Sequence, residues 1–512
     1  MDRKWWTLLA VCVATFMLLL DITIVNVALP DIQRDLNASL SGLQWVVDAY
    51  ALTLAALLLT AGALADLFGR RLVFAIGVSI FTVASLLCGL STTPLFLHLA
   101  RGLQGVGGAG MFATSLALIA QEFQGPERGT AIAAWGATIG GAVAIGPLVG
   151  GVLTEGLGWQ WIFFVNVPIG IGAVALALAR SGESRDPNAK GIDWAGLVSF
   201  SGALFALNFG LLRGNAEGWS SAPIVGSLVG AVVLLIVFAI AELRRARPMF
   251  DITLLRKPAF AGVSAGTFAI GAGMFAMFLY LTIYLQDVLD LSPLQAGLRF
   301  LPLTLFAFIV PLATRRLVSR IPARLVLGVG LALVSAGLLL MHGVSVDSDW
   351  TTLLAGFIVA GIGIGLSNPS IATTALGVVP PARSGMASGI NNTFRLSGVA
   401  TGIAALGAVF QSRIESHLAA LDPGTTKGVA DAVASGGPGA VAGEGGAQLV
   451  TAAREAFISG LNDILLVGTA TLLAGALVAF ALIRPRDFVA HGPAEAVEPA
   501  SDGERETAPE TA

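Results

Sequence analysis

The sequence predicts an all-α polytopic membrane protein with fourteen transmembrane helices. Of its 512 residues, 55% are hydrophobic and only 12% are charged, against about 25% charged residues in an ordinary soluble protein. Apolar runs of 18 residues or more recur along the whole chain, and each can cross a hydrocarbon core of about 30 Å. Lys and Arg gather in alternate connecting segments, as they do in membrane proteins with a fixed orientation.

The first span is predicted at 6–29 and is interpreted as an uncleaved helix. It follows two basic residues, as a signal peptide does, but the run is too long and Leu29-Pro30-Asp31 does not resemble a small-residue cleavage site. Thirteen more runs of sufficient length follow, at 43–64, 72–92, 95–118, 130–153, 161–179, 194–213, 222–242, 258–285, 295–313, 323–342, 351–375, 386–410 and 459–483.

The distribution of basic residues sets the expected orientation. Of the 29 Lys and Arg residues, 21 fall in segments that an even number of spans places on the side of the N-terminus, and five fall on the other side. Because basic loops stay in the cytoplasm, we expect both termini there, in a multi-pass protein of a bacterial-type cytoplasmic (plasma) membrane.

The pattern divides the chain into two similar halves of six helices, as in transporters built from repeats. Two extra helices separate the halves. A Gly/Ala-rich outer loop and an acidic tail are both expected to be flexible or disordered. The predicted segments are 1–180 for the first half, 181–257 for the linker with the extra pair, 258–483 for the second half with its outer loop at 411–457, and 484–512 for the cytoplasmic tail.

Asp21 is the leading candidate for a functional residue. It lies within LDITIVNVALP (20–30), about 22 Å along a helix that starts at Trp6. An aspartate at the centre of a spanning helix costs about 2.5–3.5 kcal/mol, so it normally faces a polar cavity or a partner. The alternative is a hydrogen bond to a neighbouring helix that serves packing alone. Asp48 lies near the start of the second span, closer to the outer interface, and is a weaker candidate.

The segment GALADLFGRR (62–71) closes the second span. Its glycines allow a tight turn between helices, and its carboxylate can accept helix N-terminal amides or pair with an arginine. The alternative is a simple loop anchor. The segment resembles the signature loop of the major facilitator superfamily, although Leu67 stands where the family pattern has a basic residue. The resemblance implies a conformational clasp made of Gly62, Asp66, Gly69, Arg70 and Arg71.

The segment ARGLQGVGGAG (100–110) places an arginine inside the fourth span. Arg101 and Gln104 are three residues apart and share a helix face. A buried arginine needs a partner unless its side chain reaches the membrane surface. The segment resembles a second motif of the same superfamily, which implies a role of Arg101 in proton coupling. Asp21, Arg101 and Asp48 are therefore the predicted coupling residues.

The segment AIGPLVGG (144–151) lies in the fifth span. Pro147 bends the helix, and Gly146, Gly150 and Gly151 allow close packing, which is common in membrane helices without any special function. The segment also resembles the antiporter motif, which separates exporters of this superfamily from symporters.

Several further segments resemble one branch of the superfamily, the fourteen-helix drug:proton antiporters (EmrB/QacA-type). WQWIFFVNVPIG at 159–170 resembles the start of the branch's sixth span, with Gln160 where the pattern has arginine. The segments 20–30, 292–302 and 384–398 also resemble it. The likeness covers about residues 6–410 and the last span.

Polar residues inside the spans are candidates for lining a substrate cavity. Amides there more often join helices, at about 0.6 kcal/mol each. Arg395 lies deep in its span and could pair with an acidic group or bind an anionic substrate. The candidates are Asn26, Gln104, Asn166, Asn391 and Arg395.

The resemblance implies a major facilitator fold of two six-helix bundles plus two extra central helices. It also implies alternating access and export of drugs or other amphiphilic or cationic compounds in exchange for protons. A carboxylate such as Asp21 would then hold either a proton or a substrate. The alternative is a dedicated exporter of one endogenous metabolite, antibiotic, lipid or peptide. A polytopic membrane enzyme would need clustered nucleophiles, bases or metal ligands, which the sequence does not offer.

Other absences bound the chemistry. None of the four lysines follows a glycine, so there is no phosphate-binding P-loop, and the four histidines have no metal-ligand spacing. We therefore expect no enzymatic activity, no metal and no cofactor, with the proton gradient as the energy source. The expected partners are a small-molecule substrate, protons and the lipid bilayer, with no nucleic acid, and the chain is expected to act as a monomer.

Overall fold

The computed structural model is mostly helical over the residues that it describes, which contain no strand. These residues are 2–123, 125–185, 193–245, 250–318, 320–379, 384–421, 427–484 and 487–488, so most of the predicted tail at 484–512 lies outside them. The helices fall where the hydropathy predicts the fourteen spans. The all-α prediction is therefore confirmed.

The first half holds six predicted spans, of which the sixth is split into two consecutive helices, α6 and α7. Its helices are α1 (Arg3–Leu36), α2 (Leu40–Phe68), α3 (Arg70–Gly89), α4 (Pro94–Glu122), α5 (Gly125–Leu157), α6 (Trp161–Phe164) and α7 (Asn166–Arg180). The extra pair follows as α8 (Trp194–Glu217) and α9 (Ala222–Arg244).

The second half begins after a short 3-10 helix, η1 (Ile252–Arg256). Its first span contains two π-helical turns, η2 and η3, of the kind that often mark functional positions in helices. The elements are α10 (Pro258–Ile270), η2 (Gly271–Phe275), α11 (Ala276–Ile283), η3 (Tyr284–Val288), α12 (Pro293–Val318), α13 (Ala323–Met341), α14 (Thr351–Gly377), α15 (Ser384–Leu421), α16 (Lys427–Gly436), η5 (Pro438–Val441) and α17 (Ala442–Leu482).

Thirteen described helices are long and apolar enough to cross a membrane. The remaining predicted span, the fifth at 130–153, corresponds to α5, which has 33 residues and a shorter apolar part at Ile145–Leu157.

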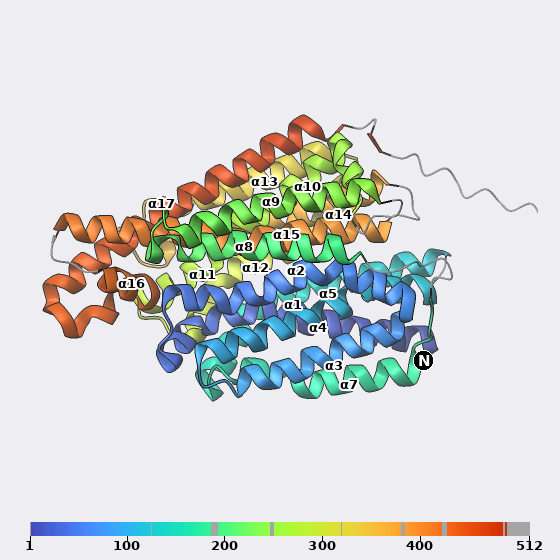
Figure 1. The fold of residues 1–512 in the computed structure, drawn as a ribbon, viewed down its shortest axis with the longest axis horizontal. Coiled ribbons are helices and arrows are strands. Elements are labelled where there is room, and N and C mark those ends of the chain that lie inside the picture. Colours follow the sequence, from blue (N-terminus) through green and yellow to red (C-terminus); the bar gives the residue numbers. More distant parts are fainter. Residues whose placement is uncertain are drawn as a thin grey trace, which may run out of the picture.

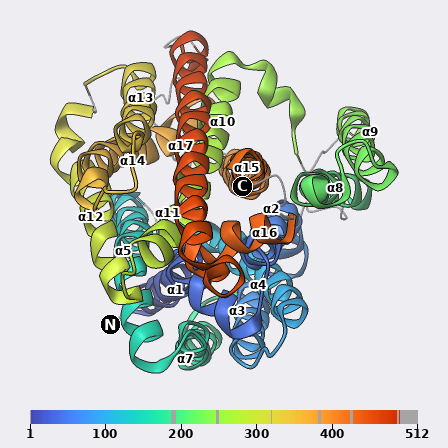
Figure 2. The same ribbon diagram turned by 90° about the vertical axis from the view of Figure 1, so that its left-hand side faces the viewer.

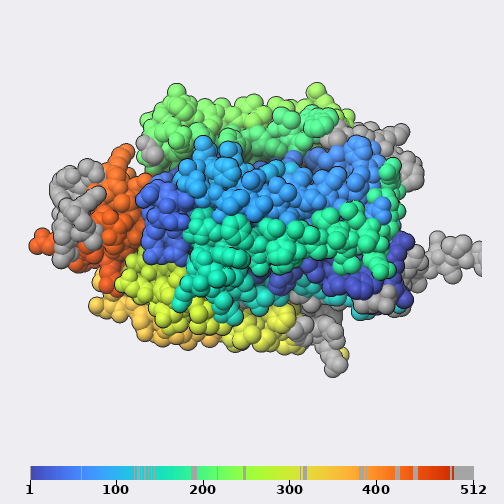
Figure 3. Space-filling view, turned by 90° about the horizontal axis from the view of Figure 1, so that it is seen from below, coloured from blue at the N-terminus to red at the C-terminus, as the bar shows by residue number. Residues whose placement is uncertain are grey.

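The two halves lie side by side with their helices roughly parallel (Figures 1 and 2). The extra pair is central in the sequence but peripheral in space: α8 packs on α2 and α15, and α9 covers α8 (Figure 2). In Figure 3, helices of the first half cover most of the visible face, with the extra pair along one edge and second-half helices along the other.

The halves meet through α5 and α12, α2 and α15, and α1 and α11. Polar contacts between them lie toward the end that carries α16, on the left in Figure 1. There, Gln286 Nε2 donates to Val27 O at 2.6 Å and Gln44 Nε2 donates to Tyr280 Oη at 2.9 Å. At the opposite end, the described ion pair of Arg3 is with Glu122, so it lies within the first half and does not join the two halves. The structure is therefore joined at its α16 end.

The expectation of an irregular outer loop at 411–457 is wrong for most of its described residues. Helix α15 continues to Leu421, α16 follows, and α17 already begins at Ala442. Helices of 38 and 41 residues are about 57 and 62 Å long, well beyond a core of about 30 Å, so both project from it. The alanines between the glycines favour helix, and α16 buries Val433 and Ala434 against this projection.

Candidate functional site: a buried ion pair in the first half

Arg101 and Asp21 form an ion pair inside the first half. Nη1 of Arg101 on α4 lies 2.5 Å from Oδ2 of Asp21 on α1, and the two side chains are 1% and 0% exposed. The predicted need of Arg101 for a partner is thus met. Because neither charge reaches water, each depends on the other for its stability.

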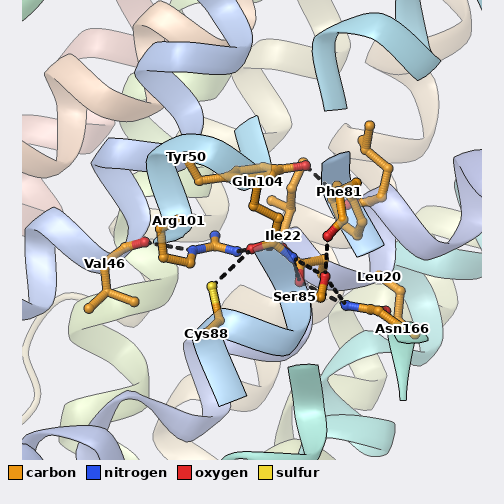
Figure 4. Close-up of polar contacts among 12 residues, drawn as sticks. Leu20, Ile22, Val46, Tyr50, Phe81, Ser85, Cys88, Arg101, Gln104 and Asn166 are labelled. Carbon is orange, nitrogen blue, oxygen red and sulfur yellow. Dashed lines mark hydrogen bonds and ion pairs between the residues drawn. The ribbon is translucent and has the colours of Figure 1, made fainter. Parts of the chain in front are cut away.

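Amide and hydroxyl groups complete the hydrogen bonding of the pair (Figure 4). Gln104 accepts from Arg101 Nη1 at 2.6 Å and donates through Nε2 to Asp21 Oδ1 at 2.8 Å. Asn166 on α7 donates to the same carboxylate oxygen at 3.2 Å, and Ser85 on α3 accepts from Gln104 at 2.9 Å. Side chains of α4 and α7 therefore meet at the carboxylate of α1, and Ser85 of α3 joins them through Gln104.

The guanidinium of Arg101 has two further contacts. Its Nε donates to the backbone oxygen of Val46 at 2.9 Å, which fixes it to α2. Its carbon lies 4.3 Å from the centroid of the Tyr50 ring, a cation–π distance. Arg101 therefore stays oriented by groups that do not depend on the charge of Asp21.

Glycine residues of α4 allow the helices to approach closely enough for this network. A Cβ atom on Gly105 would lie 2.5 Å from the backbone oxygen of Tyr50, and one on Gly107 would lie 2.4 Å from the backbone nitrogen of Phe81. These positions bring α2 and α3 against α4, so that side chains of three helices reach one point.

Asp48 lies apart from this network. It is 0% exposed on α2, and neither carboxylate oxygen has a hydrogen-bond partner among the described residues. Gln44, one turn earlier, makes the contact to Tyr280 of the second half. The structure thus places Asp48 beside the interface of the halves, not beside Asp21.

The predicted clasp residues do come together at the N-terminal end of the molecule. Arg70 Nη2 lies 3.0 Å from Asp66 Oδ1. Gly69 has a φ of +120°, which favours glycine at this turn. Gly62 has no close neighbour that would exclude a side chain. Asp66 therefore pairs with an arginine, one of the two arrangements expected for it.

Glu183 completes the clasp and was not anticipated from the sequence. Its carboxylate accepts from the backbone nitrogens of Arg71 at 3.0 Å and Leu72 at 3.2 Å, which caps the start of α3. Its side chain also lies 3.7 Å from Arg71 Nε. The available signal was an acidic residue directly after the sixth span, on the predicted side of the clasp.

The glycines of the predicted antiporter segment form a contact surface on both sides of α5. A Cβ on Gly150 would lie 2.9 Å from the backbone oxygen of Ile24 on α1, and one on Gly146 would overlap Thr23. One on Gly151 would lie 2.6 Å from Leu294 Cα on α12. Helix α5 therefore touches the helix of Asp21 and the opposite half through adjacent residues. Pro147 lies within the same stretch.

The remaining predicted cavity residues are not joined to the ion pair. Asn26 donates to the backbone oxygen of Ile22 on its own helix at 3.1 Å. Arg395 on α15 donates to Asn368 on α14 at 3.2 Å, and Asn391 Oδ1 has no partner within the described chain. Of the five candidates, only Gln104 and Asn166 belong to the network around Asp21.

Comparison with known families matches residues 11–403 to the Major Facilitator Superfamily. The solved structure of a bacterial homologue of the human lysosomal transporter Spinster, inward-facing and unoccupied, is similar in fold. The TM-score is 0.64 at 18% identity, over 96% of this chain and 99% of that chain.

Curated relatives are similar over nearly the whole length. The multidrug resistance protein Stp of Mycobacterium tuberculosis is 37% identical over 91% of this chain and 89% of its own. The tetracenomycin C resistance and export protein of Streptomyces glaucescens is 34% identical over 93% and 91%. The puromycin resistance protein pur8 of Streptomyces alboniger is 38% identical over 83% and 85%.

Proposed function

Because the chain belongs to the major facilitator superfamily, we propose that it exports drugs or other amphiphilic small molecules in exchange for protons, by alternating access. Its relatives are named for multidrug resistance, for resistance to puromycin, and for resistance to and export of tetracenomycin C. The observation that carries the proposal of proton coupling is the buried pair of Asp21 and Arg101.

The proton would bind Asp21. Protonation removes the charge of the carboxylate and with it the attraction to Arg101, which Val46 O and the Tyr50 ring still hold in place. Helix α1 would then be released from α4. Because Ile24 of α1 lies against Gly150 of α5, a shift of α1 would reach α5 and the contact of α5 with α12.

The proton gradient supplies enough free energy for such a cycle. A proton that moves across a potential of 100 mV releases about 2.3 kcal/mol, which sustains a gradient of about 50-fold in a neutral substrate. The clasp of Asp66, Arg70, Arg71 and Glu183 lies at the opposite end from the joined α16 end, and its described contacts are formed within the first half and the residues that directly follow it.

The test uses everted membrane vesicles with an acidic interior, followed by quenching of a pH-sensitive dye. Adding ethidium, puromycin or another drug to wild-type vesicles is expected to dissipate part of the gradient, whereas Asp21→Asn vesicles should not respond. Asp31→Asn is the matched control, because Asp31 lies on the same helix and its ion pair among the described residues is with nearby Arg34. If Asp21→Asn vesicles still respond, Asp21 is not the proton-coupling residue. Asp48→Asn would then be the next variant to test.

A dedicated exporter of one endogenous compound is the second candidate. It is favoured by the names of relatives such as the probable actinorhodin transporter of Streptomyces coelicolor, 33% identical over 85% of this chain. If a strain that lacks the protein fails to secrete one compound and accumulates it inside the cell, while its drug resistance is unchanged, the dedicated exporter would be favoured over broad drug export.

The remaining expectations extend the proposal. The transporter would act as a monomer in the cytoplasmic membrane, with both termini inside, driven by the proton gradient without a cofactor. The excess of basic residues in the predicted inner segments supports this orientation. This orientation can be tested by introducing a cysteine at the N-terminal end of the protein and labelling intact cells with a reagent that does not cross the membrane.

A further inference from the structure

Arg395 is a cation in the middle of the second half. It lies eleven residues after the first residue of α15, Ser384, which is about 16 Å along the helix. That depth is near the centre of a hydrocarbon core of about 30 Å. An arginine at this depth is stable only where it faces the protein interior and finds compensation.

The guanidinium of Arg395 is nearly free of partners. Of its five N–H donors, Nη2 donates to Asn368 Oδ1 at 3.2 Å, and Nε has no partner in the described structure. No ion pair to Arg395 occurs among the described residues. A single neutral amide leaves its charge uncompensated.

The second half offers no carboxylate that could pair with it. The sequence contains no Asp or Glu in 252–286, 291–346, 350–414 and 464–486, which include the membrane-depth parts of its helices. In the first half, Asp21 is taken by Arg101, and Asp48 on the neighbouring α2 makes no contact to Arg395. The compensating charge must therefore come from outside the chain.

Arg395 lies on a helix that is enclosed by other helices of the protein. Helix α15 is surrounded by α2, α8, α10, α14 and α17, and Figure 2 shows it in the middle of the molecule. Arg395 is nevertheless only half-buried, and no described residue of α15 from Met386 to Phe410 is exposed. Asn391, one turn away on the same face, has an amide oxygen without a partner.

We propose that Arg395 and Asn391 form the binding site for the anionic group of an amphiphilic organic substrate, such as a carboxylate, phenolate or sulfonate. The guanidinium supplies charge and unused N–H donors, and the Asn391 amide, whose two ends can exchange by rotation, supplies another donor. The apolar helices around the site suit the rest of the molecule. This inference rests on the proposed function and names the substrate class that it serves.

The test compares two dyes with the same ring system and opposite charge, fluorescein (anionic) and rhodamine 123 (cationic). Binding is measured by fluorescence anisotropy on the purified full-length protein in phosphatidylcholine nanodiscs, without a proton gradient. Wild type should bind fluorescein. Arg395→Gln should bind it about 10- to 100-fold more weakly, as expected for loss of a hydrogen bond to a charged group.

Three variants make the result specific. Arg395→Lys should retain part of the fluorescein affinity, and Asn391→Ala should lose about 5- to 10-fold. Arg299→Gln is the control, because Arg299 on α12 lies over the Trp350 ring and outside the proposed site. None of the variants should weaken binding of rhodamine 123. The Arg395→Lys protein keeps the charge and guards against a general folding defect.

Failure of the inference can be told from failure of the proposed function. No fluorescein binding by wild type, or equal binding by wild type and Arg395→Gln, would overturn the inference. So would loss of fluorescein binding in phosphatidylglycerol nanodiscs, which would assign the guanidinium to a lipid headgroup. Drug-dependent proton movement in vesicles, alongside any of these results, would leave the export function standing.

Discussion

The carboxylate of Glu155 in the first half accepts a hydrogen bond of 2.6 Å from the hydroxyl of Ser292 in the second half. The same oxygen accepts from the backbone nitrogen of Leu294 at 3.1 Å, so Glu155 caps the first turn of α12 from across the interface. Under the proposed alternating access, both bonds would break as the α16 end opens. Glu155 would then stabilise the joined state and not the opened one.

Glu155→Ala is expected to shift the protein toward the opened state about fivefold, since an exposed hydrogen bond contributes about 1 kcal/mol. Spin labels at Leu157→Cys and Leu298→Cys, with the two native cysteines replaced by alanine, would report the separation of α5 and α12. Glu217→Ala is the matched control, because the ion pair of Glu217 among the described residues is with Arg213 on its own helix. An unchanged distance distribution in Glu155→Ala would show that this cap does not hold the halves together.

Breaking the buried ion pair from one side should be more harmful than removing it. Arg101→Gln and Asp21→Asn are each expected to lower the free energy of unfolding, by up to about 3–5 kcal/mol, because each leaves the other group buried without its partner. The double variant should lose less than the sum of the two. Detergent unfolding of all four proteins gives the coupling energy, and simple additivity would mean that the pair is not energetically linked.

The close approach of α3 and α4 should depend on the absence of a side chain at Gly107. A methyl group there would meet backbone atoms of Phe81 and Gly77, so Gly107→Ala is expected to destabilise the protein by about 1–3 kcal/mol. Gly172→Ala is the control, since nothing lies within 4 Å of its added methyl. That variant should be neutral or more stable by up to about 1 kcal/mol. Equal melting temperatures for the two variants would contradict the packing argument.

Asp431 on α16 makes the docking of this helix sensitive to pH. Burial raises the pKa of its carboxyl group above the ordinary value, and its contact is a 3.4 Å hydrogen bond from Gln411. A group whose pKa is raised by docking favours the docked state as the pH falls through that pKa, and disfavours it above. Asp431→Asn should therefore slow hydrogen exchange of α16 at neutral pH and have little effect in acid. Asp463→Asn, which breaks a pair with Arg413, should not slow exchange at neutral pH.

The fold was largely predictable because hydropathy and loop charge act locally along the chain. Each predicted span coincides with a helix, since a run of apolar residues in lipid must satisfy its backbone internally. The lateral position of α8 and α9 was not predictable, because both have apolar residues that suit lipid or protein equally. The helices that occupy most of the described residues in 411–457 were not predicted, because frequent glycine favours disorder, whereas the alanines and the contacts of α16 favour helix.

The sequence predicted which residues belong to the site, but it did not predict which of them contact each other. Asp21 and Arg101 stand out because charges are rare in spans, and each was expected to need a partner. That they are partners of each other, 80 residues apart, depends on the packing of α1 and α4. Ser85 and Glu183 gave no comparable signal, since a hydroxyl in a helix and an acid in a loop are both ordinary. Asp48 resembled Asp21 in the sequence, yet it faces a different part of the molecule.

The glycine contacts of α5 have a consequence for the entropy of opening. Where Gly151 meets Leu294, and where Gly297 meets Pro147, backbone atoms touch without an intervening side chain on one partner. A glycine has no rotamers to free when such a contact separates, whereas a larger side chain would gain up to about 1.5–2 kcal/mol of conformational freedom. Separation along this seam would therefore leave the conformational entropy of the glycine side nearly unchanged.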